Sequence, residues 1–191
     1  MKAIILLHEI YGMNRFMDTQ RQKYEKLGFA VFCPDFCGGR VFGYDETGDA
    51  YRWFYEQAGL DSYRRVWDLV DGLSKQYAAV YLLGFSVGAT LAWRCSENPN
   101  CAGAIACYGS RIRNFPEVVP RCPTLLFFAE KDSFDVSVLA ERLTQIPNTR
   151  LRLFPGEHGF LDPDSGHYHA PAANEAEAEI LRFLSEESAR I

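Results

Sequence analysis

The sequence predicts an α/β protein built on a mostly parallel sheet of about six strands, with helices on both faces. Short apolar runs rich in Val, Ile, Leu and Phe recur along the chain, which is typical of strands that are buried on both faces. Segments of helical length lie between most of these runs. With 191 residues, 48% of them hydrophobic, the chain can form one substantial core, so we expect a single domain over residues 1–191.

Six apolar runs are the predicted strands, and they cover residues 3–7, 30–33, 79–85, 103–108, 123–129 and 150–154. Right-handed crossovers place the first strand between the second and the third, which gives the strand order 2-1-3-4-5-6. The direction of winding then reverses between the strand that ends at His8 and the strand that ends at Phe85. In open parallel sheets, ligands bind beyond the carboxyl ends of the strands at such a reversal.

Five helices are predicted from apolar periodicity and stop signals, at residues 16–27, 61–76, 87–97, 134–145 and 172–186. Gly28 ends the first helix, and Pro99 and Pro147 follow the third and the fourth. The long connections at residues 36–48 and 109–121 remain as loops, and loops of this length in a compact domain tend to be functional.

The turn Gly84-Phe85-Ser86-Val87-Gly88 joins the third predicted strand to the third predicted helix. In this position, Gly-x-Ser-x-Gly is typical of a nucleophile elbow, in which the flanking glycines let the backbone bend until the serine hydroxyl projects from the sheet edge. The sequence therefore predicts that Ser86 is a nucleophile.

A serine nucleophile needs a histidine that accepts its proton and an acid that holds the histidine, and after an elbow they follow in the order acid, histidine. Asp132 comes after the fifth predicted strand and His158 after the sixth, so we expect both to meet Ser86 at one sheet edge. The predicted oxyanion donors are the backbone N–H groups of Val87, which follows the nucleophile, and Ile10, in the loop after the first strand.

Other roles are open to some of these residues. Asp132 could cap the helix predicted near Phe134, and Asp135 is its nearest competitor as the acid. The stretch His167-Tyr168-His169 offers metal-ligand side chains, but it lies in a loop flanked by Pro and Gly, and we predict no metal and no cofactor. A nucleotide or flavin binder is disfavoured, because the chain has no Gly-x-Gly-x-x-Gly.

Charge and cysteine content exclude several classes of partner. The net charge of −5 leaves no basic surplus for nucleic acid or an anionic membrane, and Arg64-Arg65 and Arg111-Ile112-Arg113 are predicted to be solvated faces. The six cysteines form no Cys-x-x-Cys pair, which favours buried thiols in a reduced compartment. The first apolar run is too short for a signal peptide core, so we expect a cytoplasmic protein.

With these motifs placed, the chain resembles the dienelactone hydrolase family of the α/β-hydrolase fold. The segments that carry the resemblance are His8-Glu9-Ile10-Tyr11-Gly12-Met13-Asn14, Pro34-Asp35, the elbow, Glu130-Lys131-Asp132-Ser133-Phe134 and His158-Gly159-Phe160. The resemblance spans nearly the whole chain and implies the α/β-hydrolase fold. No insertion in the sequence is large enough for a lid domain, so we expect a minimal form of this fold. It also implies a nucleophile, acid and base at Ser86, Asp132 and His158, an oxyanion hole from Ile10 and Val87, and no cofactor.

Two departures from the family pattern are informative. The best-known members carry a cysteine at the elbow, with an acid matching Glu9 that helps to form the thiolate, whereas a serine hydroxyl needs His158 as general base during attack. Three roles therefore stay open for Glu9: orienting His8, restraining Ser86 or shaping the loop.

The second departure concerns the substrate. Members that cleave dienelactone hold its carboxylate with two arginines, and the matching positions here are Thr47 and Asp162. Without this cationic clamp we expect a substrate other than dianionic dienelactone.

The resulting hypothesis is a serine hydrolase that cleaves a small carboxylic ester or lactone through an acyl-enzyme, as a monomer or small homo-oligomer. Thioester or peptide cleavage by the same groups, and a non-catalytic binding protein, are the alternatives. The residues predicted to shape the pocket, together with the 36–48 loop, are Glu9, Tyr11, Phe42, Tyr44, Tyr51 and Phe160.

Overall fold

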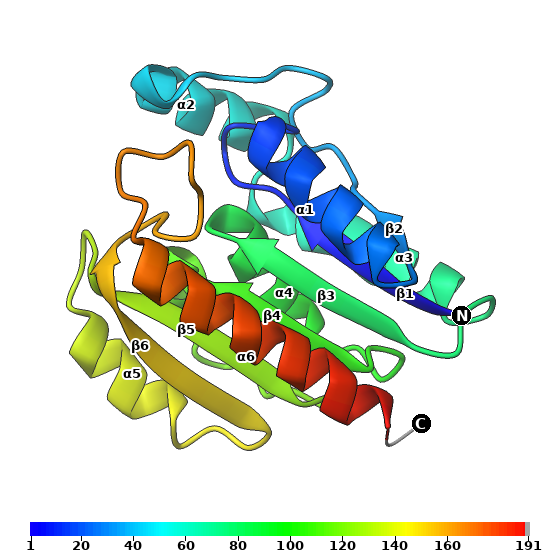
Figure 1. Ribbon diagram of the computed structural model, residues 1–191. Helices are drawn as coiled ribbons and strands as arrows, with labels where there is room; N and C mark the ends of the chain where they lie inside the picture. Colours follow the sequence, from blue (N-terminus) through cyan, green and yellow to red (C-terminus); the bar gives the residue numbers. More distant parts are fainter. Residues whose placement is uncertain (190–191) are drawn as a thin grey trace.

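The computed structural model describes residues 1–189, and its centre is a six-stranded sheet with the order β2-β1-β3-β4-β5-β6 (Figure 1). The strands are β1 (Lys2–Leu7), β2 (Phe29–Phe32), β3 (Val80–Phe85), β4 (Gly103–Cys107), β5 (Thr124–Lys131) and β6 (Thr149–Glu157). Every pairing between neighbours in this sheet is parallel. The predicted fold class and strand order are confirmed.

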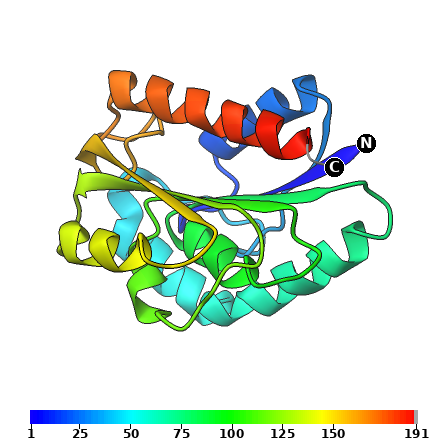
Figure 2. The ribbon, with the colours of Figure 1, turned by 90° about the horizontal axis from the view of Figure 1, so that it is seen from below.

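Helices cover both faces of the sheet. They are α1 (Arg15–Lys26), α2 (Thr47–Gln57), α3 (Tyr63–Leu73), α4 (Val87–Cys95), α5 (Val136–Leu143) and α6 (Ala170–Ser188). Figure 2 shows α1 and α6 on one face and α2 to α5 on the other. This division follows from the strand order, because a right-handed connection must change faces when the winding reverses at β1.

The core lies on both sides of the sheet, as the apolar strands require. Along β1, Ile4 and Leu6 pack in the layer under α1 and α6, whereas Ala3, Ile5 and Leu7 pack on the opposite face. All five side chains are fully buried, so β1 has no polar face, and the alternation is that of a central strand.

Within residues 1–189, the structure adds one α-helix that the sequence did not predict, together with short 3₁₀ segments at Tyr44–Glu46, Leu60–Ser62 and Ser110–Asn114. Helix α2 covers much of the segment between β2 and α3, and of its side chains only Ala50 and Phe54 are buried. Four of the five residues from Tyr51 to Tyr55 are aromatic, a residue type with a lower intrinsic helix propensity, so the sequence favours a connection here. The indole N–H of Trp53 donates to the carbonyl of Cys37 at 2.9 Å, which ties α2 to the loop after β2.

All six cysteines are free thiols, and five of them are buried, with Cys33 half-buried. Within residues 1–189, none of the helices has the length and apolar character needed to cross a membrane.

Candidate active site

The turn after β3 holds Ser86 in a strained conformation. Its φ of 51° lies in the left-handed region, which a non-glycine residue rarely adopts. A Cβ at Gly84 would collide with the carbonyl of Gly88, and a Cβ at Gly88 would collide with the carbonyl of Leu7 at the end of β1. The two glycines are therefore needed for the close approach of α4 to β1 and β3, and this packing holds Ser86 above the sheet edge.

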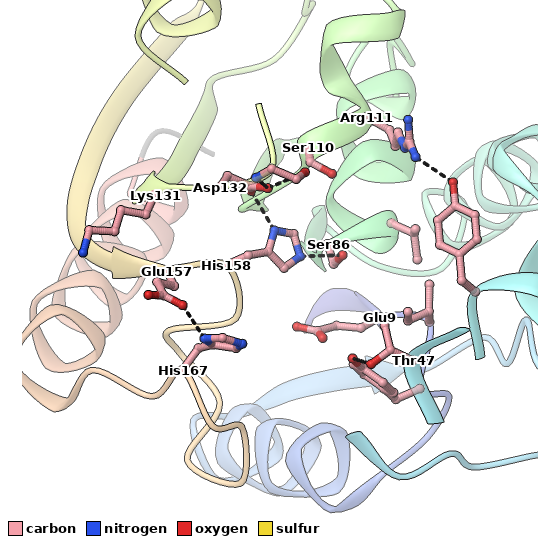
Figure 3. Close-up of a pocket in the computed structure, with 15 residues that line it drawn as sticks. Glu9, Thr47, Ser86, Ser110, Arg111, Lys131, Asp132, Glu157, His158 and His167 are labelled. Carbon is pink, nitrogen blue, oxygen red and sulfur yellow. Dashed lines mark hydrogen bonds and ion pairs between the residues drawn. The ribbon is translucent and has the colours of Figure 1, made fainter. Parts of the chain in front are cut away.

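Three side chains from distant segments form one hydrogen-bonded chain at this edge (Figure 3). His158, directly after β6, places Nε2 2.9 Å from Oγ of Ser86 and Nδ1 2.8 Å from Oδ2 of Asp132. The N–H and the hydroxyl of Ser133 donate to the other oxygen of Asp132, at 2.6 and 3.0 Å. An imidazole held in this way can accept the proton of the Ser86 hydroxyl.

Asp132 and Asp135 have different partners in the structure. Asp135 is the N-cap of α5, and its carboxylate accepts from the N–H groups of Ser137 and Val138 at 3.0 and 3.3 Å. Because Asp135 takes the capping role, Asp132 is left to bond to His158.

The electrostatics of the chain favour an ion pair between His158 and Asp132. Burial alone would lower the pKa of His158, but the hydrogen bond and the charge of Asp132, together with Glu9, raise it above its ordinary value. For Asp132, burial opposes ionisation, but His158 and the Ser133 donors outweigh it and lower the pKa. The protonated form of the His158 ring is therefore stabilised by its surroundings.

Glu9 is a second acidic group beside this chain. Its side chain is 7% exposed, and its Oε1 has no hydrogen-bond partner among the described residues. Burial raises the pKa of Glu9 to about 7. The charge of His158 lowers this pKa in part, and the charge of Asp162 raises it further. The carboxyl of Glu9 therefore keeps its proton to a higher pH than a free glutamate does.

The pocket at Ser86 has a volume of about 510 Å³. Its lining includes the predicted residues Glu9, Ile10, Tyr11, Tyr51, Ser86, Val87, Asp132 and His158. The N–H of Val87 opens helix α4 and so has no acceptor within the helix, which leaves it available to a ligand.

Three aromatic residues that were predicted to shape the pocket do not line it. Phe42 is buried, and the guanidinium carbon of Arg40 lies 4.3 Å from the centroid of its ring. Phe160 is fully buried in the core. Tyr44 lies behind Tyr11, with their ring centroids 4.7 Å apart. Packing, which the sequence pattern does not specify, takes the rings of Phe42 and Phe160 into the interior, whereas Tyr44 is half-buried.

The wall that the 36–48 loop was expected to supply comes instead from α2. Within that range, only Thr47, the first residue of α2, lines the pocket, and its hydroxyl lies 3.0 Å from that of Tyr11. Asp162, at the other position where dienelactone-cleaving members carry arginine, is buried and accepts a hydrogen bond from the hydroxyl of Tyr44.

The sequence analysis missed six lining residues, which are Ser110, Arg111, Lys131, Ser133, Glu157 and His167. Arg111 was assigned to a solvated face, but it donates to the hydroxyl of Tyr51 at 2.7 Å across the mouth of the pocket. Lys131 lies on the opposite side of the Ser86–His158 pair (Figure 3). Neither cation forms an ion pair with a carboxylate within residues 1–189.

The side chains considered as metal ligands near the end of the chain are dispersed. His167 pairs with Glu157 at 2.7 Å, whereas Nδ1 of His169 accepts from the N–H of Ala172 at the start of α6, at 3.2 Å. These two histidines have separate partners.

Comparison with known proteins identifies the family of the chain. The sequence profile of the Dienelactone hydrolase family matches residues 1–188. The chain belongs to the dienelactone hydrolase family. It is 36% identical over 172 residues to the uncharacterised protein YczH of Bacillus subtilis, covering 87% of this chain and 84% of that protein. It is 21% identical over 198 residues to carboxymethylenebutenolidase 1 of Cupriavidus pinatubonensis, covering 95% and 85% of the two chains.

Solved structures place this member of the family in the α/β-hydrolase fold. The dienelactone hydrolase-like promiscuous phosphotriesterase P91, from metagenomic libraries, superposes with a TM-score of 0.77 at 17% identity, over 97% of this chain and 86% of that one. Est1E of Butyrivibrio proteoclasticus, solved with ferulic acid bound, superposes with a TM-score of 0.71 at 14% identity, over 99% and 90%. At these identities the likeness concerns the fold alone.

Proposed function

We propose that the protein is a serine hydrolase that cleaves a small carboxylic ester or lactone through an acyl-enzyme. The observation that carries this proposal is the hydrogen-bonded chain from Asp132 through His158 to Ser86, placed within a pocket. Family membership supports the reaction class, and the strained turn at Ser86 supports its role as the nucleophile.

In the first half of the reaction, Oγ of Ser86 bonds to the substrate carbonyl carbon while its proton passes to Nε2 of His158. Asp132 holds the imidazole and stabilises its positive charge. The N–H groups of Ile10 and Val87 stabilise the oxyanion. When the tetrahedral intermediate collapses, the bond to the alcohol oxygen breaks and that oxygen takes the proton from His158.

In the second half, His158 accepts a proton from water, and the water oxygen bonds to the acyl carbon. Collapse of this intermediate releases the acid, and Ser86 regains its proton. Neutral His158 is needed at the start of both halves, so the reaction requires a pH above the pKa of this imidazole.

The choice of substrate rests on the walls of the pocket. Thr47 and Asp162 supply no cationic clamp, which favours a substrate other than dianionic dienelactone. Instead of that clamp, the pocket is lined by two other cationic side chains, Arg111 and Lys131. These cations suit an ester with a single acidic substituent. Thioester or peptide cleavage uses the same groups and differs only in the leaving atom.

The proposal is tested by measuring hydrolysis of a panel of p-nitrophenyl esters and lactones of varied chain length and charge, together with one thioester and one peptide. Ser86→Ala is expected to lower turnover of the best substrate by at least about 10³-fold. Ser110→Ala, which removes a second serine hydroxyl from the same pocket, is the matched control and is expected to keep most of the turnover.

Two results would count against the proposal. If wild type and Ser86→Ala hydrolyse the panel at equal rates, Ser86 is not the nucleophile. If the wild-type protein turns over no member of the panel, the non-catalytic alternative is favoured.

A further inference from the structure

His8 is a fully buried histidine that the proposed mechanism does not use. It follows β1 directly, its side chain has no exposed surface, and its ring lies against Phe36 with centroids 5.3 Å apart. A buried imidazole must satisfy both of its ring nitrogens, so its partners show what it holds in place.

The two partners of His8 come from the loops after β1 and β2. The backbone N–H of Phe36 donates to Nε2 at 2.9 Å, so Nε2 carries the lone pair and the ring proton resides on Nδ1. Nδ1 lies 2.5 Å from the backbone oxygen of Glu9 and donates to it. Burial lowers the pKa of His8, which keeps the imidazole in this neutral form.

The acceptor of this bond belongs to the peptide group that contains the oxyanion donor of the proposed function, the N–H of Ile10. The carbonyl of Glu9 and the N–H of Ile10 are two ends of one peptide unit, which is planar and trans. Fixing the oxygen therefore fixes the direction of the N–H. The N–H of Gly12 also donates to the Glu9 oxygen, but its bond of 3.3 Å is longer than the bond from His8. A donor on the carbonyl also polarises the unit and strengthens its N–H as a donor.

We propose that His8 is a positioning residue: its Nδ1–H holds the Glu9 carbonyl so that the Ile10 N–H faces the oxyanion formed on the substrate. Its Nε2, by accepting from Phe36, anchors the ring to the loop after β2. This inference rests on the proposed function, because it assigns a role to His8 only through the Ile10 donor.

A metal site is the other reading of this region. His8, Asp35 and Cys37 offer ligand atoms that all lie within 4.8 Å of one another. However, Nε2 of His8 already accepts from Phe36, and the carboxylate of Asp35 accepts from the N–H groups of Cys37, at 2.7 Å, and Gly39. Because backbone donors occupy these atoms, they account for the cluster without a metal.

Two substitutions separate the two bonds of His8. Asn carries its amide nitrogen on Cγ, where His carries Nδ1, so His8→Asn keeps a donor to the Glu9 carbonyl and loses the acceptor for Phe36. Gln carries its amide oxygen one atom further out, near the place of Nε2, so His8→Gln keeps the acceptor for Phe36 and loses the short donor to Glu9.

The measurement is kcat and KM for the best ester of the panel, together with the melting temperature of each variant. We expect His8→Gln to melt close to wild type but to lose about 10- to 100-fold in kcat with little change in KM, since a misdirected oxyanion donor weakens transition-state binding. We expect His8→Asn to melt at a lower temperature but to keep kcat within about threefold of wild type.

Equal loss of kcat in both variants, or no loss in His8→Gln, would overturn the inference. If a variant does not fold, the ring nitrogens of His8 in the wild-type protein are examined by ¹⁵N NMR at pH 7. The inference requires the Nδ1–H tautomer, and the Nε2–H tautomer or a charged ring would refute it. Absence of ester turnover in the wild type would instead refute the proposed function.

Discussion

Glu9→Gln tests the electrostatics of the site, because it replaces a buried carboxyl by a neutral group of the same shape. Burial raises the pKa of Glu9 from 4.5 to about 7. Between these two pH values the folded protein holds a proton that the unfolded chain has released, so the free energy of unfolding falls as the pH rises. Each pKa unit corresponds to about 1.36 kcal/mol, so the loss over this window is about 3 kcal/mol.

Glutamine cannot ionise, so the variant avoids this loss. We expect the stability of Glu9→Gln relative to wild type to rise by about 3 kcal/mol between pH 4.5 and pH 8. Urea unfolding of both proteins at several pH values across this range measures the difference. Glu141→Gln, at an exposed glutamate on α5, is the matched control and should follow wild type at each pH. A difference between Glu9→Gln and wild type that stays constant with pH would refute the reasoning.

The same substitution should move the pH profile of hydrolysis. The charge of Glu9 contributes to the raised pKa of His158, and the reaction needs neutral His158. Removing that charge lowers the pKa of His158, so the acidic limb of kcat/KM should shift to lower pH in Glu9→Gln. A shift to higher pH would contradict the placement of this carboxyl beside the imidazole.

Three other predictions follow from the site and its supports. Asp132→Asn should lower kcat by about 10²- to 10⁴-fold with little change in KM, because the amide no longer holds His158 in the required tautomer; steady-state kinetics measures it. Arg111→Gln should raise KM about 10-fold for an ester with an acidic substituent and leave a neutral ester of equal size unaffected, and equal changes for both would exclude a charge effect. In urea unfolding, Gly88→Ala should lower the free energy of unfolding by more than about 2 kcal/mol, because the added Cβ would collide with the Leu7 carbonyl. Gly72→Ala in α3 should raise the free energy of unfolding by about 1 kcal/mol, because open space surrounds Gly72 and alanine favours the helix.

The sheet and its order could be predicted because buried parallel strands leave a strong mark on the sequence. In β1 every residue from Ala3 to Leu7 is apolar and fully buried, so the run is unmistakable. Once the order was known, the positions of Ser86, Asp132 and His158 after strands β3, β5 and β6 implied that they share one edge.

The pocket walls could not be predicted in the same way, since they depend on how irregular segments pack. Phe160 and Tyr51 are both aromatic residues near motifs, yet one is fully buried and the other is 39% exposed. Arg111 reaches the pocket because the short 3₁₀ segment Ser110–Asn114 lies opposite α2, a helix with only two buried side chains. The 3₁₀ segment is too short to leave a periodic pattern in the sequence, and the aromatic residues of α2 have a lower helix propensity.

The role of Ser86 is tested most directly by covalent labelling. The wild-type protein is treated with a fluorophosphonate, and the adduct is located by mass spectrometry of its peptides. The proposed function predicts one adduct per chain, on Ser86, and none in Ser86→Ala under the same conditions. An adduct on another residue, or equal labelling of both proteins, would contradict it.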